Sequence, residues 1–175
     1  MIRLVAAEWL KLRTLKSLWV CAGTALVLTP AAATLSRLLA AAVLQAMIIV
    51  LAAVVPGSEF ATGTIRTTFL ATPRRIAVMI AKALVVTVVA AVLGGGCLML
   101  TYAVDVRYGT VVGRLAVDIG YCVLVALFAF AVTLAVKHTA SAVSLALSAV
   151  LLVRLVLMVV SMMFGADPST ALWNL

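Results

Sequence analysis

The stretch from Ser58 to Arg75, SEFATGTIRTTFLATPRR, is the longest segment of this 175-residue chain that cannot lie in hydrocarbon. It contains four threonines between positions 62 and 68, together with the charged residues Glu59, Arg66 and Arg74. The sequence on either side consists mostly of Ala, Val and Leu. Cytoplasmic loops of membrane proteins concentrate Lys and Arg. We therefore predict that this segment is a cytoplasmic loop between two membrane-spanning helices.

The composition indicates a membrane protein without the help of any motif. The chain is 67% hydrophobic and 10% charged, with a mean hydropathy of +1.34, whereas soluble domains are roughly half apolar and a quarter charged. We predict an all-α, polytopic transmembrane helical bundle that forms a single domain over residues 1–175. The formal net charge is +8, but the basic residues lie in short flanks. This placement favours membrane lipid rather than nucleic acid as a partner.

Apolar runs and their polar flanks set the expected elements. An amphipathic interfacial helix is expected over 1–16, since apolar residues recur there at helical spacing and basic residues lie mostly away from them. Five spans are expected at 18–35, 38–55, 76–104, 112–136 and 140–164, with the cytoplasmic segment at 58–75 and an external tail at 165–175. The first two spans, at 18 residues each, are near the lower limit for crossing about 30 Å of hydrocarbon. Only Ser36-Arg37 separates them, which predicts a very tight outer turn.

Local signals refine the boundaries of the polar segment. Pro56-Gly57 predicts the end of the second span. Ser58 is then placed to cap a short helix, with Glu59 in its first turn favoured by the helix dipole. Thr72-Pro73 predicts a second helix start, with Thr as the N-cap and Pro at the first helical position.

The distribution of basic residues predicts the topology. With the amino end inside, nine basic residues fall on the cytoplasmic side, three fall outside and one lies within the membrane; the inside set is Arg3, Lys11, Arg13, Lys16, Arg66, Arg74, Arg75, Lys82 and Lys137, and the outside set is Arg37, Arg107 and Arg114. This bias favours a cytoplasmic amino terminus. An alternative is that Pro30 to Ala33 resembles a signal-peptide cleavage site. The long, patterned start with Glu8 argues against that alternative.

Several intramembrane residues are candidate functional or packing positions. Arg154 lies near the middle of the last span, where a charge is costly and is a functional-site hypothesis by default. The functional hypothesis is weighed equally against a structural one, in which Arg154 forms an ion pair or snorkels to water in a cavity; Asp118 is a candidate partner if Arg154 reaches outward. Asp118 can also pair with Arg114 four residues earlier. Lys82 is expected to snorkel towards the inner surface.

Small residues predict where helices approach one another. Gly94-Gly95-Gly96 predicts a kink or a close helix contact. Ala140, Ser144 and Ser148 form a stripe suited to close packing. The cysteines at positions 21, 97 and 122 stand alone in apolar runs, so we expect buried small hydrophobes rather than disulfides or a metal site.

Two motifs resemble type-2 ABC transporter permeases, particularly the short actinobacterial-like ones. In GSEFATGTIRTTFLATPRR the shared features are the pair Glu59-Phe60, then Gly63 to Arg66, then Pro73 to Arg75 before a membrane helix. The second motif, Glu-Trp-x-Lys-x-Arg over Glu8 to Arg13, resembles the elbow helix that opens these permeases. A plain solvated loop whose arginines only set topology is the alternative for the first motif.

The resemblance implies a membrane subunit of an ABC exporter in the bacterial plasma membrane. It implies that 58–75 forms a cytoplasmic coupling helix that docks on a separate ATPase subunit, and that a second permease copy, identical or different, completes the transporter. The expected docking residues are Glu59, Phe60, Thr64, Arg66, Arg74, Arg75 and His138, and the expected elbow-helix residues are Glu8, Trp9, Lys11 and Arg13. The cargo is expected to be hydrophobic, by analogy with the family.

The chain departs from the family in two places. Relatives carry a longer external segment between the first two spans, and they continue into a sixth span after a Trp-containing segment similar to residues 165–175. These departures favour an alternative function as a non-transporting accessory or immunity protein derived from such a permease.

The sequence lacks the common nucleotide-binding and metal-binding motifs. It holds no GxxxxGK[ST] or HExxH pattern and a single histidine, so we expect no ATPase site of its own, no catalytic residues, no metal site and no cofactor.

Overall fold

The computed structural model describes residues 2–14, 16–63, 75–104 and 111–163, and within these ranges the chain is helical apart from short turns, with no strand. The helices are α1 (Ile2–Thr14), α2 (Lys16–Leu35), α3 (Arg37–Thr62), α5 (Arg75–Val104), α6 (Val111–Val136) and α7 (Thr139–Met163). The predicted all-helical class is confirmed. The predicted outer loop near Asp105 and the tail at 165–175 lie outside the described residues.

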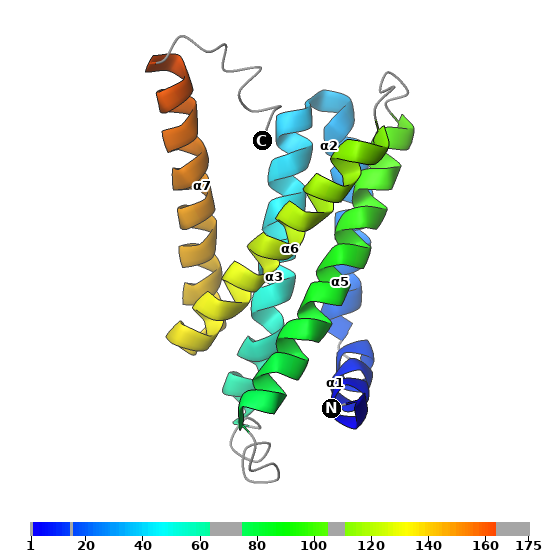
Figure 1. The fold of residues 1–175 in the computed structure, drawn as a ribbon, viewed down its shortest axis with the longest axis vertical. Helices are drawn as coiled ribbons and strands as arrows, with labels where there is room; N and C mark the ends of the chain where they lie inside the picture. The colour runs from blue at the N-terminus through cyan, green and yellow to red at the C-terminus, as the bar shows by residue number, and fades with distance from the viewer. Residues whose placement is uncertain (1, 15, 64–74, 105–110, 164–175) are drawn as a thin grey trace.

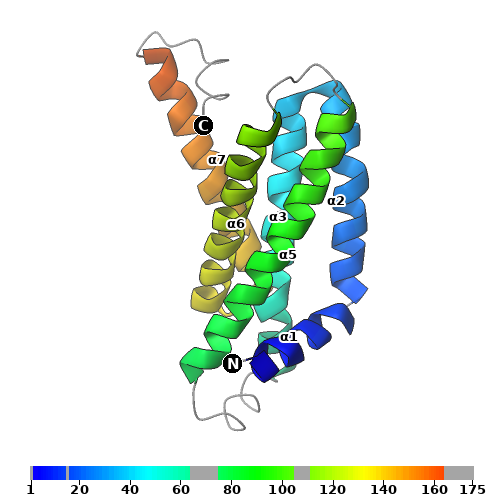
Figure 2. The same cartoon turned by 45° about the vertical axis from the view of Figure 1, so that its right-hand side comes forward.

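Five helices, α2, α3, α5, α6 and α7, are long and apolar enough to cross a membrane, as expected for a multi-pass membrane protein. They run lengthwise in alternating directions, while α1 lies across one end of the bundle (Figures 1 and 2). We call this end the α1 end and the opposite end the far end. The end of α3 and the start of α5 lie at the α1 end (Figure 1).

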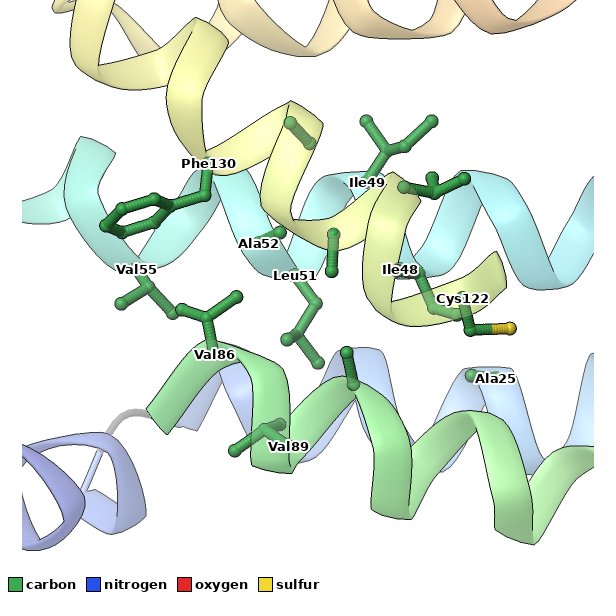
Figure 3. Packing of buried hydrophobic residues seen from close by; sticks show 14 of the residues in the cluster. Ala25, Ile48, Ile49, Leu51, Ala52, Val55, Val86, Val89, Cys122 and Phe130 are labelled. Atoms are coloured by element: carbon green, nitrogen blue, oxygen red, sulfur yellow. The ribbon is translucent and has the colours of Figure 1, made fainter. Parts of the chain in front are cut away.

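Helix α3 is the centre of the bundle. It packs against α2, α5, α6 and α7. Half of the residues in its most hydrophobic 18-residue stretch are buried, compared with 11% in the corresponding stretch of α7. Figure 3 shows the core around it, a cluster of buried side chains that includes Ile49, Ala52 and Val55 of α3, Val86 of α5 and Phe130 of α6. Lipid tails are as apolar as these side chains, so van der Waals fit rather than the hydrophobic effect holds spans together. Fully buried alanines such as Ala126 and Ala129 therefore permit close helix approach.

The triple glycine of α5 serves close packing. A Cβ added to Gly94 would lie 3.1 Å from Cβ of Cys122 in α6, a contact tighter than ordinary van der Waals packing. The predicted close contact is confirmed, and α5 continues as one helix through these glycines. Cys97 and Cys122 are buried in the core, as expected for small hydrophobes, whereas Cys21 is only partly buried.

Helix α7 packs over only part of its length. Ala142 and Ala146 are fully buried, and beyond Val150 most of its described side chains are exposed. Figure 1 shows the far half of α7 standing away from α3 and α6. The predicted stripe is wrong, because Ala140, Ser144 and Ser148 are exposed; the two serine hydroxyls donate instead to carbonyls of their own helix. Alanines make the closer contact since they carry no polar atom to satisfy.

The turn between α2 and α3 is as tight as predicted. Ser36 alone separates the two helices, with an extended backbone (φ −163°, ψ 148°), and its hydroxyl accepts a hydrogen bond from the backbone N–H of Leu39. This is a side-chain N-cap of α3. Pro30 lies inside α2, which runs on to Leu35.

The prediction that Pro56-Gly57 ends the second span is wrong. Helix α3 continues through both residues to Thr62 and ends at Gly63, whose φ of 69° is the left-handed conformation of a glycine C-cap. Ser58 is not an N-cap, since its hydroxyl donates to the carbonyl of Val55 one turn earlier. Neighbouring helices support the backbone around a proline inside a span. Glu59 and Phe60 thus belong to the last turn of α3 rather than to a separate helix.

Gly57 makes room for the start of α7. A Cβ added there would lie 2.3 Å from Oγ1 of Thr139 and 2.9 Å from its Cβ. A methyl group therefore does not fit, and rotating the Thr139 side chain would not move its Cβ away. The absence of a side chain brings the end of α3 into contact with the turn before α7, and it ties that turn to the α1 end.

Replacing this glycine should destabilise the bundle. We expect Gly57→Ala to lower the free energy of unfolding by about 1–3 kcal/mol, the usual cost of overpacking, as measured by thermal or denaturant unfolding in detergent micelles. Thr139→Ala removes two of the three clashing atoms and should recover part of the loss. The matched control is Gly23→Ala in α2, where a Cβ meets nothing within 4 Å; it should be neutral or stabilising. Equal effects at both glycines would contradict this account.

Candidate functional site

A buried lysine joins three helices at the α1 end. Lys82 of α5 is 3% exposed, and its Nζ donates to Oε2 of Glu8 at 2.7 Å and to Oε1 of Glu59 at 2.6 Å. Glu8 comes from α1 and Glu59 from the last turn of α3. The expectation that Lys82 snorkels to the surface is wrong, because two carboxylates bring the compensating charge to it.

A second lysine extends the group. Lys11 of α1 donates from Nζ to Oε1 of Glu59 at 2.8 Å, although its own side chain is 47% exposed. We call Glu8, Lys11, Glu59 and Lys82 the charge network. Its two lysines and two glutamates balance in formal charge. The other oxygen of Glu59, Oε2, has no hydrogen-bond partner in the described part of the chain.

Local sequence explains why these side chains meet. Glu8 and Lys11 are three residues apart on α1, so they lie on one face. Glu59 follows the buried Val55 by one helical turn, and Lys82 follows the buried Val78 in the same way. Each charged side chain therefore continues an apolar face that already points into the bundle, and the three faces converge where α1 crosses the ends of α3 and α5.

The energetics of the network favour a role in helix registration. Two buried ion pairs repay the cost of removing charges from water only when geometry and additional hydrogen bonds are good. Lys82 has two short contacts, but Glu59 retains an unpartnered oxygen. The network is thus weak evidence for high stability. It fixes the position of α1 relative to α3 and α5, because any displacement of α1 would separate buried charges.

The remaining predicted residues are placed as follows. Trp9 is exposed on α1, and Arg13 contributes its carbonyl as the acceptor for Nε1 of Trp19 at 2.9 Å. Phe60 is partly buried next to Glu59. Thr64, Arg66 and Arg74 and the side chain of Arg75 lie outside the described residues, so their docking role stays a prediction.

A short turn at Lys137 and His138 joins α6 to α7, as expected between the spans predicted at 112–136 and 140–164. Lys137 adopts a positive φ of 61°, and its N–H donates to the carbonyl of Thr133 at 2.9 Å. His138 is exposed, and its carbonyl accepts from the N–H of Ala142. In the described part of the chain no group of three His, Cys, Asp or Glu residues could hold a metal ion.

The predicted pair between Arg154 and Asp118 is not formed. Asp118 of α6 accepts a hydrogen bond from the hydroxyl of Tyr102 at 2.6 Å, while Arg154 contacts the side-chain oxygen of Gln45 at 3.5 Å. The predicted pair of Asp118 with Arg114 cannot be judged, since the Arg114 side chain lies outside the described residues. A second polar group, distinct from the charge network, thus occupies the far half of the bundle.

Sequence reasoning missed the partnership of Lys82 with Glu8 and Glu59. A usable signal was present: the interfacial helix, the start of the polar segment and the third span carry Glu8, Glu59 and Lys82 near the same predicted membrane surface. Opposite charges placed at one depth by three adjacent helices attract one another strongly, because few other groups there can solvate them.

No family model, curated protein or solved structure matches this chain.

Removing the buried lysine should be costly. Lys82→Met keeps a long side chain but leaves the Glu8 and Glu59 carboxylates facing each other without their shared donor. We expect a loss of about 3–5 kcal/mol in the free energy of unfolding, as for other broken buried pairs, measured by denaturant unfolding in micelles. Adding Glu59→Gln should recover part of it. The matched control, Lys16→Met at an exposed position of α2, should change little; equal losses would refute the buried-pair account.

The hydrogen bond from Lys11 to Glu59 raises the pKa of the Lys11 ammonium above its ordinary value, which is about 10.4. A raised pKa in the folded state contributes stability that is complete below the unfolded value and is lost as pH rises through the folded value. The melting-temperature difference between the wild type and Lys11→Gln should therefore be constant from about pH 7 to 9 and shrink above about 10.4. Lys11→Arg stays charged and should keep the difference. A gap that persists unchanged at high pH would contradict this.

Proposed function

We propose that this chain is the membrane-spanning permease subunit of an ABC exporter, driven by a separate ATPase subunit and inserted in the bacterial plasma membrane with its amino terminus in the cytoplasm. The observation that carries the proposal is the charge network. It ties the transverse helix α1 to the two helices, α3 and α5, that lead into and out of the basic segment 58–75.

The network supplies a path for force. A partner that pushes on the basic segment acts on the last turn of α3 and the first turn of α5. Glu59 lies in this last turn of α3, Lys82 lies about two turns into α5, and both contact α1. Packed helices shift as stiff bodies between discrete arrangements rather than deforming continuously. A push at the cytoplasmic surface would therefore move α1, α3 and α5 together and change access to the bundle interior.

The structure changes the role that we assign to Glu59. Its side chain is 7% exposed and engaged with two lysines, so it is a poor surface contact in this conformation. We assign it to transmission inside the membrane subunit. Docking on the ATPase is assigned to Arg66, Arg74 and Arg75, with the exposed His138 as a minor second contact. Arginine suits such a contact because its guanidinium binds carboxylates in a bidentate way.

A non-transporting accessory function is the second candidate. The observation that favours it is the turn between α2 and α3, where Ser36 alone separates the helices and leaves no external segment to gate a substrate. Under this alternative the protein would bind a partner in the membrane without stimulating ATP hydrolysis.

The decisive experiment is co-expression with any ABC ATPase subunit that a neighbouring gene encodes, followed by affinity purification and measurement of ATP hydrolysis in lipid nanodiscs. We expect the wild type to copurify the ATPase. The double charge reversal Arg66→Glu/Arg74→Glu should weaken the association about tenfold or more, as for truncated interfacial charge pairs, with no change in melting temperature. Lys11→Gln should retain binding but lower substrate-stimulated hydrolysis.

The matched control is Arg107→Glu, a charge reversal in the predicted outer loop, which should not alter ATPase binding. Topology is tested by a single cysteine at Thr67 in a background without the native cysteines. A membrane-impermeant maleimide should not label it in intact cells. Labelling there, or an ATPase that fails to bind the wild type, would overturn the proposal; binding without stimulation would favour the accessory function.

A further inference from the structure

Arg154 has an incompletely satisfied guanidinium inside the membrane region. It is half-buried, and its hydrogen bond from Nη1 to Oε1 of Gln45 is long, at 3.5 Å. No carboxylate lies within 4 Å of it in the described ranges, where the ion pairs found all belong to the charge network. A guanidinium offers five N–H donors, so most of its capacity remains for another acceptor.

Two further polar groups converge on it from other helices. Gln45 of α3 directs its oxygen to Arg154 and donates from Nε2 to the hydroxyl oxygen of Tyr121 in α6. The Tyr121 hydroxyl accepts this hydrogen bond, and its own proton has no acceptor in the described part of the chain. Arg154, Gln45 and Tyr121 therefore present donors from three helices, and we call them the donor triad.

The donor triad lies well below the far surface of the bundle. At about 1.5 Å per residue, Gln45 is about 12 Å from the far end of α3, Tyr121 about 15 Å from that of α6, and Arg154 about 14 Å from that of α7. The three estimates agree, so the triad occupies one level. That level lies within the hydrocarbon layer, whose half-thickness is about 15 Å.

The surroundings of the triad are apolar and open to the membrane. Beyond Val150 the far half of α7 stands away from α3 and α6 (Figure 1). Five apolar side chains in this half of α7 are 55–61% exposed: Leu151, Leu152, Val153, Leu155 and Val156. Tyr121 is itself 43% exposed. A molecule in the bilayer can thus reach the triad from the side while its apolar part contacts α7.

We propose that the donor triad binds the anionic headgroup, a carboxylate or phosphate, of an amphiphile whose hydrocarbon chain lies along the far half of α7. Charge complementarity selects an anion, because no carboxylate lies within 4 Å of Arg154 in the described ranges; Asp118, one turn from Tyr121 on α6, accepts a hydrogen bond from Tyr102 instead. Geometry selects an oxyanion, because a planar guanidinium binds carboxylate and phosphate through two parallel hydrogen bonds. The exposed leucines and valines select an amphiphile over a free ion.

The depth of the triad identifies this amphiphile as cargo, an assignment that rests on the proposed exporter function. The headgroup of a resident lipid lies at the membrane surface, whereas a site about 12–15 Å below the far end holds a headgroup on its way across. The binding claim itself needs no ATPase and is tested without one.

The test is binding of matched amphiphiles to the full chain in a neutral detergent, measured by native mass spectrometry at equal mole fractions. The probes are laurate, dodecyl phosphate and the uncharged dodecanol. We expect both anions to bind the wild type at least tenfold more tightly than dodecanol. Arg154→Gln should lower anion binding about tenfold or more and leave dodecanol unaffected, in keeping with the strength of hydrogen bonds to charged groups. Tyr121→Phe and Gln45→Leu should cause smaller losses.

The matched control is Arg37→Gln, which removes a basic residue at the far end of α3 and should leave anion binding unchanged. Equal losses for Arg37→Gln and Arg154→Gln would show mere surface attraction and overturn the proposal. Melting temperatures distinguish a binding role of Arg154 from a structural one. Arg154→Gln should leave the melting temperature unchanged if Arg154 binds ligand, and should lower it if Arg154 holds the helices together. If Arg154→Gln does not fold, Arg154→Lys replaces it in the binding test. Unchanged laurate binding in both Arg154→Lys and Tyr121→Phe would likewise overturn the proposed site. Loss of ATPase copurification with binding intact would refute the exporter function alone.

Discussion

The fold depends on how one buried ammonium group is compensated. Lys82 lies inside the apolar bundle at the α1 end, where water does not solvate it, and two carboxylates from different helices take the place of water. A charge in this position is tolerated only while Glu8 and Glu59 remain in reach. The condition is geometric: α1 must lie across the bundle, and α3 must extend to its last turn beside α5. The arrangement of three helices therefore follows from the needs of a single side chain.

The rest of the bundle is held by fit. The central helix α3 presents small or fully buried residues to four neighbours, and glycines at two levels allow backbones to approach, Gly57 towards α7 and Gly94 towards α6. Such contacts are individually weak but numerous. Polar groups are grouped at separate levels, with the charge network near the α1 end and the donor triad towards the far end. Force applied at one level and binding at the other would be joined by α3, which contributes Glu59 to the first and Gln45 to the second.

The sequence predicted the helix class, five apolar helices of membrane length and the tight turn at Ser36, because apolar runs of this length leave few alternatives. It failed at Pro56-Gly57, where rules drawn from soluble helices predict an end. Within a membrane bundle the helix continues, because neighbouring helices support the backbone and the missing side chain of Gly57 leaves room for Thr139. The partners of Lys82 and Arg154 were also missed. Pairing between helices depends on rotation about each axis, and a sequence fixes that rotation only when its apolar face is distinct, which it is not for α5 or α7.

The turn at Ser36 constrains how the protein is made and how it moves. Helices joined through one residue with a side-chain cap have no slack, so α2 and α3 must enter the bilayer as a preassembled hairpin. They also cannot slide past each other afterwards. Any rearrangement of the bundle must therefore move α2 and α3 together as one unit, so a displacement of α3 also displaces α2.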